Sequence, residues 1–136
     1  MGYVYSAGGA AISWSSNKQK TVALSTMESE LYALTEASRH AYLVNSLGKD
    51  ILRTAGMGLI LNCDNQAAIA VATNAEHYSA RTKHISVREM KVKEIVEQGV
   101  IKLNYVNSED NVADILTKPL KEGAFVKLRA ALGVVE

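Results

Sequence analysis

Residues 59–73, LILNCDNQAAIAVAT, place an apolar run of strand length directly before an alanine-rich segment. The run predicts a buried strand over residues 59–63, and the polar residues after it predict a turn into a helix over residues 67–73. A strand that leads into a helix is the repeating unit of α/β folds. The stretch therefore indicates an α/β protein with Asp64 at the carboxyl end of a strand.

The segments on either side add strands first and helices later. Short apolar runs at residues 3–5 and 10–14 flank Gly8-Gly9 and predict a hairpin, and residues 21–24 predict another strand. Ser25 and Glu28 have capping-box spacing for a helix that we expect to end near Leu47, before Gly48. Farther on, the patterns predict a helix over 84–98, a strand over 101–105, a short helix over 108–117 and a last helix ending at Gly133. This order predicts a mixed sheet flanked by helices.

Composition limits the class of protein. With 136 residues and 48% hydrophobic content, we expect one domain over residues 1–136. A net charge of +1 excludes a uniformly basic surface, so any nucleic-acid contact must be a local patch. No window reaches the roughly 18 apolar residues of a membrane span, so we expect a soluble protein with no membrane partner.

The cysteine and histidine content indicates a reducing compartment. Cys63 is the single cysteine and cannot form an internal disulfide, and the three histidines are too scattered to build a zinc site with it. No basic residue precedes the first apolar stretch, as a secretory signal would require. We expect an intracellular protein, cytoplasmic or nuclear, that is not secreted.

Three carboxylates occupy positions at which α/β proteins often have functional residues: Glu30 on the first helix, Asp64 after a strand, and Asp114 after the last strand. Carboxylates that converge repel one another unless a divalent cation lies between them. Oxygen ligands suit Mg²⁺ or Mn²⁺, and two such ions roughly 3.5–4 Å apart are the usual device for phosphodiester hydrolysis. Each residue alone also has a structural alternative. Asp64 could cap the following helix, Glu30 could be a solvated helix residue, and Asp114 could be a favourable charge in a first helical turn.

Several motifs, in order over nearly the whole chain, carry a family resemblance. They are Gly2-Tyr3-Val4, Ala11-Ile12-Ser13-Trp14, residues 21–34 (TVALSTMESELYAL), residues 63–70 (CDNQAAIA), Arg81-Thr82-Lys83-His84-Ile85 and residues 112–120 (VADILTKPL). Together they resemble the ribonuclease H domain of copia-type retrotransposon Pol polyproteins. The resemblance implies an RNase H-like mixed sheet, an endonuclease that hydrolyses the RNA strand of RNA/DNA hybrids, and two Mg²⁺ (or Mn²⁺) ions. It also implies that Glu30, Asp64 and Asp114 are catalytic metal ligands.

The chain departs from the family pattern at two places. The family's first, central strand and its catalytic Asp have no counterpart here, and no acidic residue precedes Glu28. We therefore expect an amino-terminally truncated domain with impaired activity, whose open strand edges pair with each other, with a second copy or with a partner strand. No histidine lies between Tyr105 and Asp114, where many relatives have one, which predicts weaker catalysis.

Residues 81–93 form the best candidate for phosphate contact, because this segment contains five Lys or Arg residues and only one Glu. The structural alternative is that these charges form an ordinary solvent-exposed helix face. We predict nucleic-acid contacts from six residues: Asn65, Gln66, Arg81, Lys83, His84 and Arg88. Two functions remain as alternatives to a ribonuclease. One is a non-catalytic nucleic-acid-binding protein, and the other is a protein-interaction module derived from a retrotransposon.

Overall fold

Four strands form two separate pairs in the computed structural model, which describes residues 1–18, 25–52, 58–73 and 86–134. β1 (Gly2–Ala7) and β2 (Ala10–Ser16) are antiparallel, with Val4 opposite Trp14. β3 (Leu59–Cys63) and β4 (Ile101–Tyr105) are parallel, with Leu61 opposite Leu103. The mixed α/β class is confirmed. The strand predicted at residues 21–24 lies outside the described residues.

The β1–β2 hairpin turns at the two glycines that predicted it. Gly8 and Gly9 have φ angles of 59° and 83°, and a two-residue hairpin loop needs this left-handed backbone at its centre. The register shifts between Tyr5 and Ser6, so the ladder is irregular near the turn.

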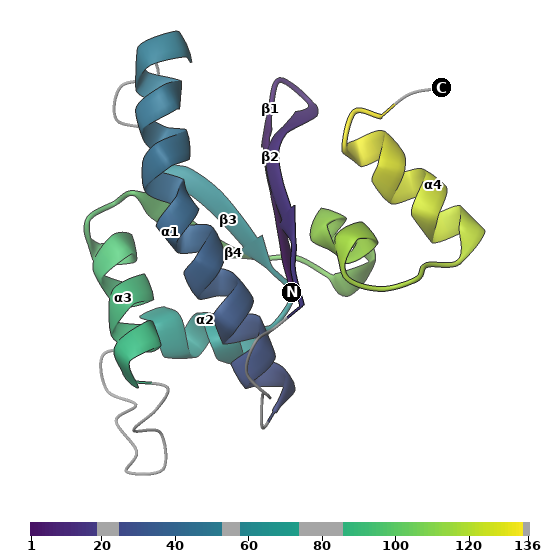
Figure 1. The fold of residues 1–136 in the computed structure, drawn as a ribbon. Helices are drawn as coiled ribbons and strands as arrows, with labels where there is room; N and C mark the ends of the chain where they lie inside the picture. Colours follow the sequence, from purple (N-terminus) through teal and green to yellow (C-terminus); the bar gives the residue numbers. More distant parts are fainter. Residues whose placement is uncertain (19–24, 53–57, 74–85, 135–136) are drawn as a thin grey trace.

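The helices lie around the strand pairs as Figure 1 shows. α1 (Thr26–Leu52) contacts both β1 and β3, and it also packs on α2 (Gln66–Thr73) and α3 (Ser86–Glu97). On the other side of the hairpin, α4 (Glu122–Ala131) packs against η3 (Val112–Leu116), a 3-10 helix that also contacts β1. No helix within these described segments has both the length and the apolar character to cross a membrane.

The core lies where α1 meets the strands and α3. Leu31 of α1, Val92 and Ile95 of α3 and Ile101 of β4 are 0–2% exposed. Along α1, the buried face recurs at helical spacing and consists of Leu31, Leu34, Ser38, Ala41 and Val44. α1 is thus the central packing element of the fold.

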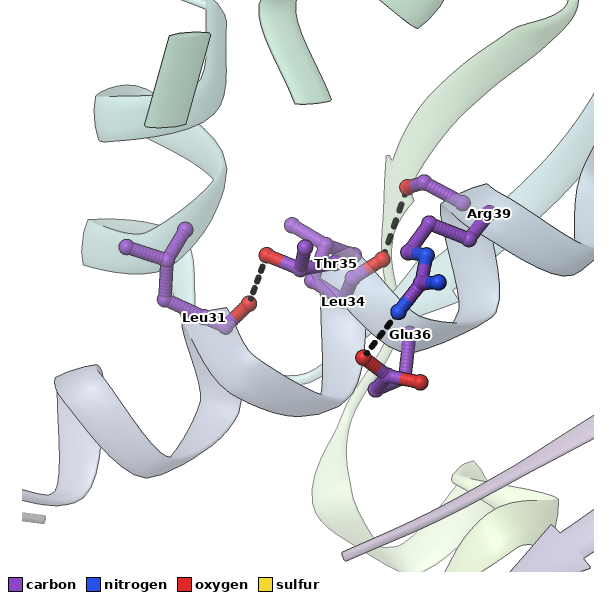
Figure 2. Close-up of polar contacts among 6 residues, drawn as sticks. Leu31, Leu34, Thr35, Glu36 and Arg39 are labelled. Atoms are coloured by element: carbon purple, nitrogen blue, oxygen red, sulfur yellow. Dashed lines mark hydrogen bonds and ion pairs between the residues drawn. The ribbon is translucent and has the colours of Figure 1, made fainter. Parts of the chain in front are cut away.

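Two buried hydroxyls of α1 are satisfied within the helix (Figure 2). Thr35 Oγ1 donates to the Leu31 carbonyl and Ser38 Oγ to the Leu34 carbonyl, each at 2.7 Å. An exposed ion pair joins Arg39 to a glutamate one turn earlier. Because the buried hydroxyls have partners, α1 can pack polar residues into the core at little cost.

Two boundaries differ from prediction. α1 does not end at Gly48 but continues to Leu52, so the roughly 1 kcal/mol helix penalty of one glycine is too small to end the helix. The short helix predicted over residues 108–117 is two 3-10 segments, η2 (Ser108–Asp110) and η3. They are separated by Asn111, whose backbone is extended and whose side chain accepts a hydrogen bond from Ala113 N (3.3 Å).

Candidate metal centre

Three side chains meet beside the carboxyl end of β3. Glu30 lies in the second turn of α1, Cys63 is the last residue of β3, and Asp64 follows it. One ligand atom from each of these side chains lies within 4.8 Å of the other two. Both carboxylates are half-buried and the thiol is buried. The structure therefore brings together two of the three predicted carboxylates and adds a cysteine.

Asp64 is free of the capping role that was its structural alternative. The Ala68 N–H at the start of α2 donates to Asn65 Oδ1 (3.0 Å), so Asn65 caps the helix instead. Asp64 Oδ2 accepts a hydrogen bond from Ser108 Oγ (2.8 Å), which comes from η2. A hydroxyl distant in sequence thus orients the carboxylate beside Glu30.

Glu28 is directed along its own helix rather than into the site. Its carboxylate accepts a hydrogen bond from the Tyr32 hydroxyl (2.6 Å), and its backbone N–H donates to Ser25 Oγ (3.1 Å). The second contact confirms Ser25 as the cap of α1. Since Glu28 and Glu30 are about 200° apart around the helix axis, their different surroundings follow from helix geometry.

Asp114 lies at the border of this cluster. Its side chain, in η3, is 13% exposed, and Asp114 Oδ2 is 2.5 Å from Lys118 Nζ. Asp114 does not share the 4.8 Å grouping of Glu30, Cys63 and Asp64. Its negative charge nevertheless acts on Glu30.

The electrostatics of Glu30 reflect a concentration of negative charge. Burial raises the pKa of this carboxyl, and the nearby charges of Asp64 and Asp114 raise it further. The Lys118 ammonium acts in the opposite direction on the Glu30 pKa. A divalent cation among these oxygens would remove the repulsion, so the residues present fit a hard metal ion.

Cys63 does not suit that role. Burial raises the pKa of its thiol, as do the charges of Glu30 and Asp64, so the thiol stays protonated at neutral pH. Metal binding by cysteine requires the thiolate, and Mg²⁺ and Mn²⁺ prefer oxygen ligands. The donor set is therefore the carboxylates.

Comparison with known proteins places the chain among retroelement sequences. It is 36% identical over 136 residues to the retrovirus-related Pol polyprotein from transposon TNT 1-94 of Nicotiana tabacum, a match that covers 98% of the chain. The chain is related to the Pol polyproteins of retrotransposons. A second Pol polyprotein, from transposon RE1 of Arabidopsis thaliana, is 32% identical over 98% of the chain. The Ty1-JR2 Gag-Pol polyprotein of Saccharomyces cerevisiae is 26% identical over 88%.

This Pol-related chain spans only a small share of those proteins: 10% of the tobacco polyprotein, 9% of the Arabidopsis one and 7% of the yeast one. No family model matches the chain, and no solved structure matches it. The similarity therefore establishes the retrotransposon relationship, while the chemistry has to be argued from the site.

The residues predicted to contact nucleic acid are only partly described. Asn65 caps α2, and Gln66 is exposed at the first turn of the same helix. Arg88 belongs to α3. Arg81, Lys83 and His84 lie outside the described residues.

Lys118, Ser108 and the position of Cys63 beside Glu30 were not predicted from the sequence. Lys118 follows Asp114 by four residues, a spacing that favours an ion pair in a helical turn and could have been noticed. Ser108 is 44 residues from Asp64, and no local pattern signals that contact.

Proposed function

We propose that this chain is an RNase H-type endonuclease domain, which hydrolyses the RNA strand of RNA/DNA hybrids with two Mg²⁺ or Mn²⁺ ions. Glu30, Asp64 and Asp114 are the proposed metal ligands. The observation that carries the proposal is the approach of Glu30 to Asp64, with the charge of Asp114 acting on the same glutamate. The relationship to Pol polyproteins supports this choice among hydrolytic functions.

Each residue has a distinct task in this proposal. Divalent ions held by these oxygens would supply the Lewis acidity needed for phosphodiester hydrolysis. Ser108 Oγ holds one oxygen of Asp64, leaving the other for a ligand. Lys118 neutralises Asp114 and has to move aside when a cation binds there. The proposed contacts to the hybrid are Asn65, Gln66, Arg81, Lys83, His84 and Arg88. These contacts would recognise the shape of the hybrid's backbone rather than its base sequence.

A protein-interaction module is the second candidate. It is favoured by an open groove between β1 and β3, which offers backbone edges to a partner. It needs neither metal nor cleavage, which makes the two functions separable by experiment.

The test is cleavage of a labelled RNA/DNA hybrid with Mg²⁺ or Mn²⁺. We expect weak metal-dependent cleavage, because no acidic residue of this chain precedes Glu28 to act as the family's first carboxylate, and Asp64→Asn should lower it by more than the roughly 10- to 100-fold cost of losing an outer-shell partner. Glu36→Gln is the matched control, because Glu36 is a half-buried α1 carboxylate paired with Arg39 rather than with the site. Cleavage that Asp64→Asn leaves unchanged, or no metal-dependent cleavage at all, would refute the ribonuclease proposal.

A further inference from the structure

The short helix η2 carries Ser108, whose hydroxyl is bound to Asp64. None of its three residues is buried, and Asn107 before it makes no side-chain capping hydrogen bond. Its own hydrogen bonds are those of a 3-10 turn, whose geometry is poorer than that of an α-helix. The position of η2 therefore depends on contacts with other elements.

α4 supplies such a contact through Lys127. The Lys127 ammonium donates to Asp110 Oδ1 at 2.6 Å and to the Glu109 carbonyl at 3.2 Å. One cation thus binds a side-chain oxygen and a backbone oxygen of the same short helix. The next residue of α4, Leu128, is buried. Lys127 therefore reaches η2 from a part of α4 that is packed against the rest of the protein.

The contacts continue from η2 into the carboxylate cluster. Ser108 Oγ donates to Asp64 Oδ2 at 2.8 Å, and Asp64 lies in the 4.8 Å grouping with Glu30. Two steps thus join α4 to the candidate metal centre: Lys127 to η2, and Ser108 to Asp64. Groups that orient a metal ligand in this way commonly change metal affinity by roughly 10- to 100-fold.

We propose that Lys127 is a positioning residue of the candidate metal centre, because it holds η2 where Ser108 orients Asp64. This inference rests on the proposed function, since it concerns the same metal site. Lys127 and Lys118 then act in opposite directions. Lys118 occupies a carboxylate oxygen that a metal ion would use, whereas Lys127 binds oxygens of η2 and supports a metal ligand from behind. A docked α4 therefore favours metal binding.

The first experiment is a Mn²⁺ titration of Lys127→Met. Removing a cation that only repelled the metal would tighten Mn²⁺ binding, whereas removing a positioning residue weakens it. Because the Lys127 side chain is 57% exposed, we expect a loss of about two- to fivefold, as for other exposed ion pairs. Lys127→Arg keeps the charge and the donors and should recover most of the affinity. Equal or tighter binding by Lys127→Met would overturn the proposal.

A double-mutant cycle tests whether Lys127 acts through Ser108. Ser108→Ala should weaken Mn²⁺ binding about tenfold, the lower end of the cost of losing an outer-shell partner. Lys127→Met should change the affinity little in the Ser108→Ala background, because the hydroxyl that Lys127 positions is then absent. An undiminished effect of Lys127→Met in that background would contradict the proposed route.

Lys121→Met is the matched control for both titrations. Lys121 is exposed at the N-cap of α4, and its side chain makes no capping hydrogen bond. The substitution removes the same charge next to the same helix without releasing η2. Its Mn²⁺ affinity should equal that of the wild type, and a loss as large as that of Lys127→Met would overturn the proposal.

A measurement on the metal-free protein separates this inference from the proposed function. ¹⁵N relaxation should give lower backbone order parameters for residues 108–110 in Lys127→Met than in the wild type or in Lys121→Met. Unchanged order parameters would show that Lys127 does not hold η2, and the metal site would stand without it. If the wild type instead binds no Mn²⁺, the proposed metal centre fails, and the positioning role fails with it.

Discussion

Replacing Lys118 should tighten metal binding at the carboxylate cluster. Lys118 Nζ lies 2.5 Å from Asp114 Oδ2, where it competes with any cation for that oxygen. At this distance the Coulomb attraction is about 1.7 kcal/mol in a water-like dielectric. Lys118 is 52% exposed, so solvent screening and side-chain entropy reduce the pair to roughly 0.5–1 kcal/mol. Lys118→Gln should therefore bind Mn²⁺ about two- to fivefold more tightly.

The assay is titration of Mn²⁺ into the metal-free protein, with free Mn²⁺ followed by electron paramagnetic resonance. Lys91→Gln is the control, because Lys91 forms an exposed ion pair with Glu94 on α3, away from the cluster. Its affinity should equal that of the wild type. Equal or weaker Mn²⁺ binding by Lys118→Gln would refute the competition between ammonium and metal.

Three further predictions concern stability. Because the pKa of Glu30 is raised in the folded state, protonation favours folding and this contribution is lost as the pH rises above the ordinary carboxyl value of 4.5. Glu30→Gln should then be more stable than the wild type at pH 7 without metal, and the difference in unfolding free energy should be smaller at pH 4. Urea denaturation at both pH values measures this difference. A variant that is less stable than the wild type at pH 7 would contradict the prediction. Tyr5→Phe removes a buried hydrogen bond from the Tyr5 hydroxyl to the Ala37 carbonyl (2.7 Å) and should cost about 1 kcal/mol in urea denaturation, so an unchanged midpoint counts against that bond. Ile95→Ala, at a site 0% exposed, should cost about 2–5 kcal/mol, whereas Leu43→Ala, at a 58% exposed site, should stay within about 0.5 kcal/mol.

Local sequence patterns predicted helices, strands and turns well where backbone preference or apolar spacing alone determines the structure. The Gly8-Gly9 turn and the strand before Asp64 follow from backbone preference and apolar spacing, and both are present. The continuation of α1 through Gly48 shows that a single glycine, a common end signal, is a weak one, because its helix penalty is only about 1 kcal/mol. The contact from Ser108 to Asp64 depends on the parallel pairing of β3 with β4, so only the tertiary fold reveals it.

The sequence predicted which residues form the candidate site better than it predicted how those residues are arranged. Glu30 and Asp64 were singled out by their positions on a helix and after a strand, and they do approach each other. Asp114 was grouped with them on equal terms, yet its nearest charged partner is Lys118. The ion pair could be inferred from spacing, but its proximity to the other two carboxylates could not.

α1 has a consequence for the order in which this molecule assembles. The Tyr5 hydroxyl joins β1 to the middle of α1 through Ala37, and α1 also contacts β3. The two strand pairs are therefore positioned by a helix rather than by hydrogen bonds to each other. Helices form from local contacts, which close quickly, whereas pairing between distant strands is slow. Each strand pair can therefore reach its final position by packing on α1, without waiting for the other pair.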